Sequence, residues 1–426
     1  MASTTSRGLG TGFAYFWTAT TVSSLGDGMT RVAAPLLVLS TTGSPLLVSG
    51  TMFAATLPWL LFSLVSGALV DRLDRRRTMV AVDACRAVAA GALGVGVALD
   101  RGGVWLLYAA LLLFGTGETL FRAAGLSMMP ALVPPDLLER ANGRLGAART
   151  VAHDMLAGPL GGFLFAASAA APFVIDGASF AVSAVLLAML PMLPGTSGRA
   201  VGPRTSPPGH RRSLRTDILE GARWLLAHRL LRTLAVLIGL LNVTLTAALA
   251  ILALLATERL GLGSVGYGLL FTALAVGGLV GSLFGEWFVR RFTARVTLRA
   301  GLVVEAAFHL CLAVSDSPVV AGLALGVFGI HGALWTIVVA SLRQRLTPGS
   351  MLGRVNSAYL FLAAGGNAIG ALLGGVVTAT FGVTAPYWIG FVVAVAVAAA
   401  TWRVLGSRMP TADGPGDAAP GDPHLA

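Results

Sequence analysis

The chain has 426 residues, of which 55% are hydrophobic and 12% are charged, and its mean hydropathy is +0.80. Because a soluble domain carries about 25% charged residues, this composition excludes an ordinary soluble protein and indicates a chain surrounded by lipid. The formal net charge is +11, and the sequence contains arginine but no lysine. The absence of lysine excludes a P-loop ATP site and a retinal Schiff base.

Apolar segments of about 20 residues recur along the whole chain, and each can cross the roughly 30 Å hydrocarbon core of a bilayer as a helix. Their continuous pattern differs from the alternation of membrane β-strands. The twelve predicted spans are 13–40, 45–70, 79–99, 104–126, 146–168, 171–193, 231–256, 265–289, 298–315, 318–341, 353–380 and 385–405. The first span lacks the short apolar region and cleavage site of a signal peptide, so we expect it to stay in the mature protein.

The spans fall into two groups of six, separated by a segment rich in Pro, Gly, Ser and Arg. We therefore predict an N-terminal six-helix bundle (1–193), a cytoplasmic linker (194–229), a C-terminal six-helix bundle (230–405) and a disordered cytoplasmic tail (406–426). The tail cannot bury enough apolar surface to fold.

Arginine residues mark alternate connections between the spans. The marked connections carry Arg72, Arg75, Arg76, Arg77, Arg140, Arg144, the arginines of 199–232, Arg290, Arg291, Arg295, Arg343 and Arg345. The opposite connections carry Arg101 and Arg259. The positive-inside rule then predicts that both termini and the linker lie in the cytoplasm. We expect a multi-pass protein of the plasma membrane. Nucleic acid is not an expected partner, because no soluble domain remains to bind it.

Metal, disulfide, cofactor and enzyme chemistry find no support in the sequence. Cys85 and Cys311 occur singly inside apolar segments, so neither a disulfide nor a metal site is predicted. The stretch GLGSVG (261–266) has the spacing of a dinucleotide-binding loop but follows no strand, and is predicted to be a turn. We expect no cofactor and no catalytic residues.

The two halves of the sequence are related by a shift of 214 residues. GALVDRLDRRR (67–77) then aligns with GSLFGEWFVRR (281–291), and LVPPDLLERAN (132–142) with LTPGSMLGRVN (346–356). Six spans separate the copies, so both halves have the same orientation. The predicted fold is an all-α polytopic membrane protein with two pseudo-symmetric six-helix bundles, as in transporters with parallel repeats.

GALVDRLDRRR resembles the signature of cytoplasmic loop 2–3 in the major facilitator superfamily, with Asp74 in place of the usual second glycine. That departure, together with SLGDGM (24–29), GTGETLFRAA (115–124), PALVPPDLLERAN (130–142) and PFVIDGASFAVSAVLL (172–187), resembles the drug, macrolide and siderophore exporters of that superfamily. The resemblance implies the superfamily fold, efflux of a small molecule, and a conformational latch on the cytoplasmic side. The latch residues would be Gly67, Asp71, Arg72, Arg75, Arg76 and Arg77, and the alternative is that these arginines serve topology alone.

Charged residues inside the spans are the candidates for coupling, since such residues are costly in a bilayer and tend to be functional. Asp27 and Arg31 are four residues apart in the first span, and Glu118 and Arg122 repeat this spacing in the fourth. Each pair can be a proton or substrate site, or a structural ion pair on one helix face. Asp83 and Arg86 are expected to join a cytoplasmic network.

The fifth span contains HDMLAGPLGG (153–162), which resembles the antiporter signature of exporters with one residue fewer between its glycine pairs. Gly158, Pro159, Gly161 and Gly162 are predicted to kink the span and allow close helix packing. Asp154 is a further proton-site candidate, and His153 is interpreted as a packed polar residue. Asp176, near the outer surface, is interpreted as structural. Three further residues can line the cavity or be packed polar residues: Glu305, His309 and His331. Candidates for the pocket lining are also Asn242, Asn367, Phe13, Phe16, Trp17, Trp59 and Trp335, of which the aromatic residues can instead face lipid or the membrane interface.

The favoured function is proton-coupled export of a small amphipathic or hydrophobic compound by alternating access, by a protein that acts as a monomer. Protons are the expected coupling ion because no ATP site is present. Alternatives that remain open are an importer or lipid transporter of the same fold, and a membrane scaffold or sensor without transport.

Overall fold

The computed structural model describes residues 9–70, 73–190, 214–349, 351–403 and 405. Within these ranges the ordered elements are all helices. Nine of the described helices are long and apolar enough to cross a membrane, and Ala385–Thr401 is a shorter apolar helix.

The N-terminal half contains six membrane spans. Its elements are α1 (Gly10–Thr42), α2 (Pro45–Val70), α3 (Arg75–Ala98), α4 (Val104–Leu132), the short η1 (Pro135–Leu137), α5 (Leu138–Arg149), η2 (Thr150–Leu156), α6 (Ala157–Ala167) and α7 (Ala171–Ala188). The segments α5, η2 and α6 follow one another without a break and together form the fifth span. This span starts eight residues before its predicted start at 146, because its first turns carry Glu139, Arg140 and Arg144, and hydropathy detects the lipid-facing part of a helix alone.

The C-terminal half repeats this arrangement after one extra helix. Its elements are α8 (Leu214–Ala227), α9 (Arg229–Ala250), α10 (Leu252–Leu254), η3 (Leu255–Arg259), α11 (Ser264–Leu283), α12 (Gly285–Arg291), α13 (Ala294–Val314), α14 (Pro318–Leu346), α15 (Leu352–Phe381) and α16 (Ala385–Thr401). Helix α8 lies inside the segment that the sequence predicts as a linker. It is helical because Leu225 is buried in the same apolar cluster as Leu231 and Leu234 of α9.

The 214-residue repeat is visible in the helix starts. Helix α14 begins at 318 and α4 at 104, α15 at 352 and α5 at 138, and α16 at 385 and α7 at 171, a separation of 214 in these three pairs. The preceding pairs, α9 with α1, α11 with α2 and α13 with α3, begin 219 residues apart. The prediction of two pseudo-symmetric six-helix bundles is therefore confirmed.

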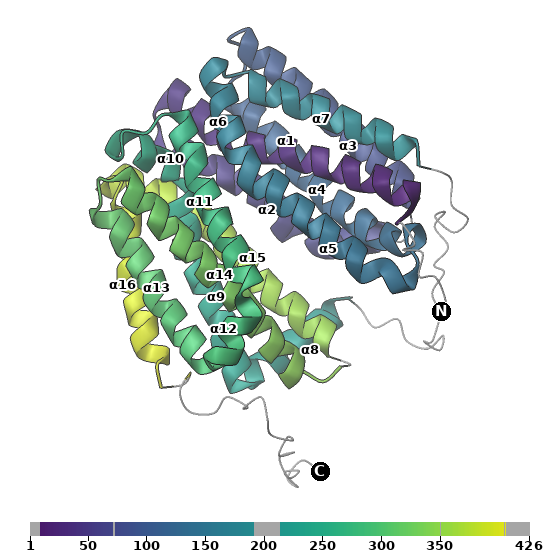
Figure 1. Ribbon diagram of the computed structural model, residues 1–426. Coiled ribbons are helices and arrows are strands. Elements are labelled where there is room, and N and C mark those ends of the chain that lie inside the picture. Colours follow the sequence, from purple (N-terminus) through teal and green to yellow (C-terminus); the bar gives the residue numbers. More distant parts are fainter. Residues whose placement is uncertain (1–8, 71–72, 191–213, 350, 404, 406–426) are drawn as a thin grey trace, which may run out of the picture.

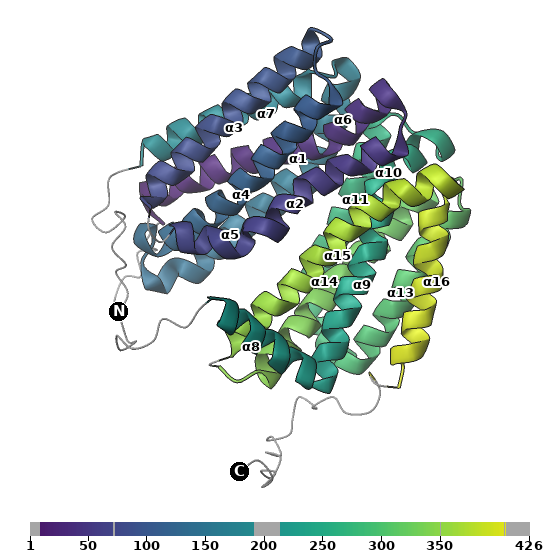
Figure 2. The same cartoon turned by 180° about the vertical axis from the view of Figure 1, so that it is seen from behind.

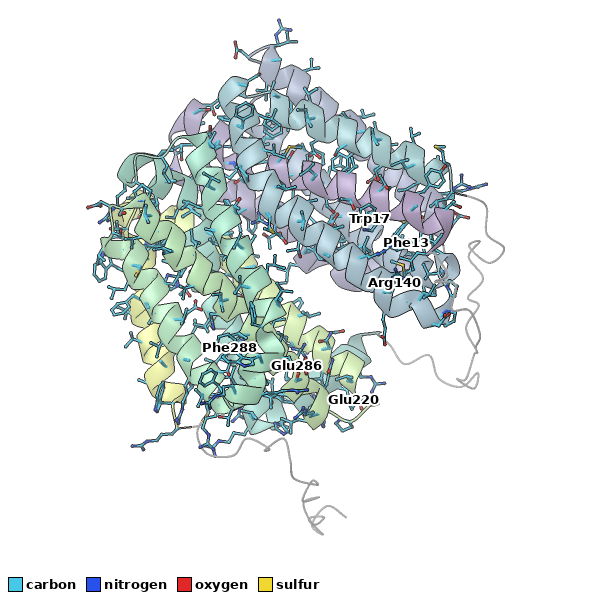
Figure 3. All side chains as sticks on the ribbon, viewed as in Figure 1. Phe13, Trp17, Arg140, Glu220, Glu286 and Phe288 are labelled. Atoms are coloured by element: carbon cyan, nitrogen blue, oxygen red, sulfur yellow. The ribbon has the colours of Figure 1, made fainter. Side chains whose placement is uncertain are left out.

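The two halves form a V in both views of the ribbon (Figures 1 and 2). They meet near α6 and α10 and diverge toward the side where α8 lies, which we call the α8 side. Arg140 of α5, Glu220 of α8 and Glu286 of α12 all lie toward the α8 side (Figure 3). The other end of the molecule, which carries the short connections 43–44, 168–170 and 260–263, is called the opposite side.

Close contacts join the two halves on the opposite side. Gly375 of α15 faces the start of α2, where a Cβ atom at this glycine would lie 2.8 Å from Cα of Leu46. Ser264 at the start of α11 donates a hydrogen bond to the carbonyl oxygen of Gly162 at 2.8 Å. Glycine at the first contact is what allows the helices to approach so closely.

Candidate functional site

A cavity of about 560 Å3 lies between the two halves. Helices α1, α2 and α4 and the segment around η2 supply most of its wall, and α9 and α15 supply the rest. The lining residues are Ser24, Asp27, Thr30, Arg31, Ala34, Pro35, Thr51, Met52, Ala55, Thr56, Trp59, Leu111, Phe114, Gly115, Glu118, Arg122, Arg149, His153, Leu245, Thr246, Leu249 and Asn367. This volume is within the range of small-molecule sites.

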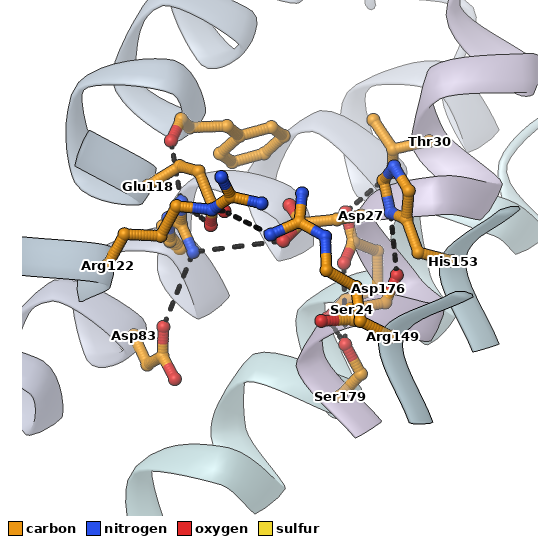
Figure 4. Close-up of polar contacts among 12 residues, drawn as sticks. Ser24, Asp27, Thr30, Asp83, Glu118, Arg122, Arg149, His153, Asp176 and Ser179 are labelled. Atoms are coloured by element: carbon orange, nitrogen blue, oxygen red, sulfur yellow. Dashed lines mark hydrogen bonds and ion pairs between the residues drawn. The ribbon is translucent and has the colours of Figure 1, made fainter. Parts of the chain in front are cut away.

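Arg86 of α3 is the centre of a charged network behind the cavity wall. Its side chain is 1% exposed, and its Nη2 donates to the carbonyl oxygen of Phe114 at 2.7 Å and to Oε2 of Glu118 at 3.1 Å. Its Nη1 lies 3.6 Å from Oδ1 of Asp83 and 3.9 Å from Oδ2 of Asp27. Figure 4 shows Asp27, Asp83 and Glu118 converging on this network. A buried guanidinium needs such counter-charges and acceptors to be stable.

Glu118 of α4 is shared by three arginines. Besides Arg86, its Oε1 accepts from Nε of Arg122 at 2.8 Å and lies 3.8 Å from Nη1 of Arg149. The guanidinium of Arg122 also lies over the ring of Trp59, 5.1 Å from its centroid. The expected Glu118–Arg122 pair is therefore present, but as one edge of a larger network.

Asp27 and Arg31 are not the ion pair that their spacing on α1 allows. Asp27 is directed to Arg86, whereas Nη1 of Arg31 lies 3.4 Å from Nε2 of His153. The guanidinium of Arg31 also lies over the ring of Phe271 of α11, 4.9 Å from its centroid. Arg86 likewise differs from its predicted place in a cytoplasmic network, because it is drawn inward by the carboxylate of Asp27 and the carbonyl of Phe114.

His153 lies in η2 between α1 and the cavity. Its Nδ1 is 3.0 Å from the carbonyl oxygen of Ser24, and since a carbonyl can only accept, Nδ1 carries the hydrogen. Its Nε2 then accepts from Arg31. Asp154 follows it, with Oδ1 at 3.9 Å from the same Nε2 and with 40% of its side chain exposed. Asp154 is not among the residues that line the cavity.

Asp176 of α7 is fully buried beside α1. It accepts a hydrogen bond from Oγ1 of Thr30 at 2.6 Å, and the hydroxyl of Ser179 lies 3.4 Å from its other oxygen. This carboxylate fixes α7 against α1, so its position fits the structural interpretation.

The fifth span changes its winding near the cavity. Its η2 segment is π-helical, a feature often found at functional sites. Pro159 follows and has no N–H to donate to the carbonyl of Met155, four residues earlier. Thr272 of α11 donates to this carbonyl instead, with 2.9 Å between Oγ1 and the oxygen. A hydroxyl of one half thus satisfies an acceptor that a proline frees in the other half.

The glycines of this span lie at close helix contacts. A Cβ at Gly158 would lie 2.5 Å from the carbonyl oxygen of Gly268 of α11, and one at Gly162 would lie 2.7 Å from the carbonyl carbon of Ser264. A Cβ at Gly161 would instead lie 2.9 Å from the carbonyl oxygen of Met29 on α1. Two of the three glycines therefore face the other half, and one faces the neighbouring helix.

Of the expected latch, Asp71 and Arg72 lie outside the described residues, and the surroundings of Gly67 are not described. Arg75 donates to the carbonyl oxygen of Ser127 at 3.1 Å. Arg76 donates to the carbonyls of Leu187, at 3.0 Å, and Ala188, at the end of α7.

Asp74 is the N-cap of α3, and its Oδ1 accepts from the backbone N–H of Arg77 at 2.8 Å. The departure from the family signature at this position therefore has a local structural role. The side chain of Arg77 is exposed.

In the C-terminal half, Glu305 of α13 lies between two histidines. Its two carboxylate oxygens are each 3.6 Å from a histidine Nε2, one in His309 and one in His331. All three are buried and are absent from the cavity lining. Among the described residues no group of His, Cys, Asp or Glu is arranged to hold a metal ion.

The remaining candidate residues either make packing contacts or line a groove or the cavity. Asn242 donates to the carbonyl of Ala363, and Asn367 accepts from Thr246, so both tie α9 to α15. Phe13 and Trp17 line a second groove, between α1 and α5, while Phe16 and Trp335 are buried. Trp59 lines the cavity.

The sequence alone did not predict that Arg86 is the centre of the charged network or that Arg149 belongs to this network. A usable signal was present for Arg86, because an arginine within an apolar span requires buried acceptors, and Asp83 alone cannot supply them. Arg149 carried no such signal, because it lies at the polar start of its span.

The sequence profile of transmembrane secretion effectors matches residues 9–420. The chain belongs to the major facilitator superfamily. This confirms the resemblance seen in GALVDRLDRRR and its companion stretches, and it identifies a multi-pass membrane transporter fold and not an enzyme.

Two curated relatives are exporters by name. The multidrug efflux pump Tap of Mycobacterium tuberculosis is 30% identical over 237 residues, which cover 54% of this chain and 53% of Tap. This chain thus matches about half the length of that relative. The enterobactin exporter EntS of Salmonella typhimurium is 25% identical over 363 residues, which cover 83% of each chain.

Among solved structures, a bacterial homologue of the iron transporter ferroportin in an inward-facing state superposes with a TM-score of 0.73 at 17% identity. The match covers 94% of this chain and 100% of the other. The outward-facing state of such a homologue gives a TM-score of 0.59 at 18% identity, with 93% and 100% covered. At these identities the likeness shows the fold alone, and the V-shaped arrangement is nearer to the inward-facing form.

Proposed function

We propose that the protein exports a small amphipathic or hydrophobic compound, drug-like or siderophore-like, in exchange for protons. The observation that carries this proposal is the cavity between the halves, which is sealed on the opposite side and has a carboxylate, Asp27, in its wall. The exporters Tap and EntS among its relatives support efflux over import.

The proposed location is the plasma membrane, with the α8 side and both termini in the cytoplasm. The arginine-rich connections support this orientation, because their described residues, such as Arg140 of α5 and Arg290 of α12, lie toward the α8 side, whereas Arg101 and Arg259 lie on the opposite side. The V therefore opens to the cytoplasm, and a compound enters the cavity from the cell interior. We expect residues 1–193 and 230–405 to act as two rigid bundles joined by 194–229, with 406–426 as a tail.

Asp27 is the proposed proton site. It lines the cavity and is 21% exposed, so water reaches it, and its partner Arg86 is buried and cannot leave with the solute. Protonation of Asp27 removes one of the three negative charges around Arg86. The bundles then respond to the changed charge balance by shifting between their two states.

The outward-open state requires a contact that holds the cytoplasmic side closed. We assign this role to the stretch 67–77, with Asp71 and Arg72 as its centre. Arg75 and Arg76 support the proposal indirectly, because they fix the start of α3 to α4 and α7 and so give the stretch a rigid base. Each chain encloses its own cavity, and we expect it to work as a monomer.

An accumulation assay in cells tests this function. The protein is expressed in a host whose own efflux pumps are deleted, and the cell content of a panel of lipophilic antibiotics is measured by mass spectrometry. We expect the cell content of at least one compound to be lower in cells that carry the protein, and to rise again when a protonophore is added. Equal contents for every compound, with and without the protein, would contradict the proposal.

A further inference from the structure

The charged groups that open onto the cavity are mostly cations. Arg122 and Arg149 have 38% and 39% of their side chains exposed, and Arg31 is also exposed. The two carboxylates in the lining, Asp27 and Glu118, are 21% and 22% exposed; Asp27 is directed to the buried Arg86, and Glu118 is shared by Arg86, Arg122 and Arg149. Both carboxylates are therefore paired with arginines of the protein, while three guanidinium groups face the space that a solute would occupy.

Among the described residues, Arg31 has no ionic partner of its own. No carboxylate in the described part of the chain lies within 4.0 Å of its guanidinium. Its nearest polar partner is Nε2 of His153, at 3.4 Å. That histidine gives its Nδ1 hydrogen to Ser24, so Nε2 must be unprotonated to accept from Arg31. A neutral imidazole orients the guanidinium without neutralising it.

The charges around Glu118 are unevenly distributed. The three arginines Arg86, Arg122 and Arg149 balance three carboxylates in number, but Asp27 and Asp83 are both on the Arg86 side of the network, so Glu118 is the carboxylate that Arg122 and Arg149 share. Arg149, at 3.8 Å from Glu118, has the weakest hold on it. Arg31 and Arg149 therefore present a cationic surface inside the membrane domain, where a charge without a counter-ion is costly.

Apolar and ring surfaces lie beside these cations. Phe271 lies under Arg31, Trp59 lies under Arg122, and Met52, Leu245 and Leu249 line the same cavity. Guanidinium groups bind carboxylates and phosphates well because their donors match two oxygen atoms at once. The site thus combines an anion-binding part with an apolar part.

We infer that the transported compound is an amphipathic organic anion, whose carboxylate, sulfonate or phosphate group binds Arg31 together with Arg149 while its apolar body packs on the rings and aliphatic side chains. This inference rests on the proposed function, since it names the substrate class of the same cavity. It also agrees with the direction of export, because an interior-negative membrane potential drives an anion out of the cell and a proton in.

Binding measurements with three matched probes test the inference. The probes are 4-(1-pyrenyl)butyrate, its neutral methyl ester, and pyrenylbutyl-trimethylammonium, which share one aromatic body and differ in charge. Dissociation constants are measured by fluorescence at pH 7 on protein in nanodiscs, with empty nanodiscs as the blank. We expect the anion to bind at least about tenfold more tightly than the ester, the size expected for one hydrogen bond to a charged group.

The variants are Arg31→Gln, Arg31→Lys and, as the control, Arg290→Gln, which removes an exposed arginine from α12. Arg31→Gln should lose about tenfold in affinity for the anion and keep the affinity for the ester, which shows that the cavity is intact. Arg31→Lys should keep part of the anion preference, and Arg290→Gln all of it. Equal affinity for the three probes, a preference for the cation, or an equal loss for all probes in Arg31→Gln would overturn the inference.

The outcome is separable from that of the proposed function. Anion binding that depends on Arg31, without transport of any compound in vesicles, would support the anion site and contradict the proposed export function. Proton-driven export of a cation, without an anion preference, would support the export function and contradict the anion site.

Discussion

Asp27 of α1 and Arg86 of α3 meet in the wall of the cavity, with Oδ2 and Nη1 separated by 3.9 Å. Asp27 is partly exposed to the cavity, whereas Arg86 is buried and is also held by Phe114, Asp83 and Glu118. The pair therefore has one member that water can protonate and one that stays fixed, which is what a coupling site requires.

Arg86→Gln is expected to destabilise the protein strongly, by about 3–5 kcal/mol, because it leaves Asp27, Asp83 and Glu118 without their common cation. The midpoint of heat-induced loss of the monodisperse peak in size-exclusion chromatography measures this effect. Arg101→Gln, in the connection between α3 and α4, is the control and should change little. Similar midpoints for both variants would show that the network around Arg86 does not stabilise the fold.

Thr272→Val is expected to weaken the seal on the opposite side. The variant keeps the shape of the side chain but removes the donor to the Met155 carbonyl that Pro159 leaves free, at a cost of about 0.5–1.5 kcal/mol. Spin labels at positions 169 and 262, with Cys85 and Cys311 replaced by alanine, report the distance across the seal. A larger share of long distances is expected.

The matched control for this experiment is Thr257→Val. The hydroxyl of Thr257 donates within its own span, to the carbonyl of Ala253 at 3.0 Å, so its loss should leave the seal unchanged. If both valine variants give the wild-type distance distribution, the contact between Thr272 and Met155 has no part in holding the opposite side closed.

Arg76→Gln and Arg77→Gln are expected to differ although the residues are neighbours. Arg76 donates to the last carbonyls of α7, where a cation also interacts favourably with the helix dipole, so its loss should cost about 1–3 kcal/mol. Arg77 is exposed and should be nearly neutral. Thermal midpoints compare the two, and an equal or larger loss for Arg77→Gln would contradict the assigned contacts.

Reporter fusions test the proposed orientation. Fusions at Gly209 and Ala426, which both lie outside the described residues, should be active with a cytoplasmic reporter, because the arginine-rich connections share their side. A fusion at Gly102, between α3 and α4, is the control and should be active with a reporter that works outside the cell. Outside activity at Gly209 or Ala426 would reverse the orientation and, with it, the direction in which the V opens.

The fold was largely accessible from the sequence because lipid imposes long apolar helices, and because the two halves repeat the same order of helices, with a 214-residue shift in the last three helix pairs. The close packing at Gly158 and Gly162 could also be predicted, since glycines in a span favour close approach of helices. The ion-pair partners of the charged residues could not be predicted from the sequence. The spacing of Asp27 and Arg31 describes one helix, whereas Arg86 and His153 come from elements 59 and 122 residues away from Asp27 and Arg31, respectively. Helix α8 was also missed, because its amphipathic pattern is short and follows a polar segment.

The most direct test of proton-coupled export uses inverted membrane vesicles, whose lumen corresponds to the cell exterior. Vesicles with an acidified lumen are incubated with an extract of the host cells, and mass spectrometry measures the compounds that accumulate inside. The account predicts that at least one compound accumulates with the unaltered protein, that a protonophore abolishes this accumulation, and that Asp27→Asn abolishes it while Asp154→Asn does not. Accumulation by Asp27→Asn equal to that of the unaltered protein, or accumulation that needs no pH gradient, would contradict the account.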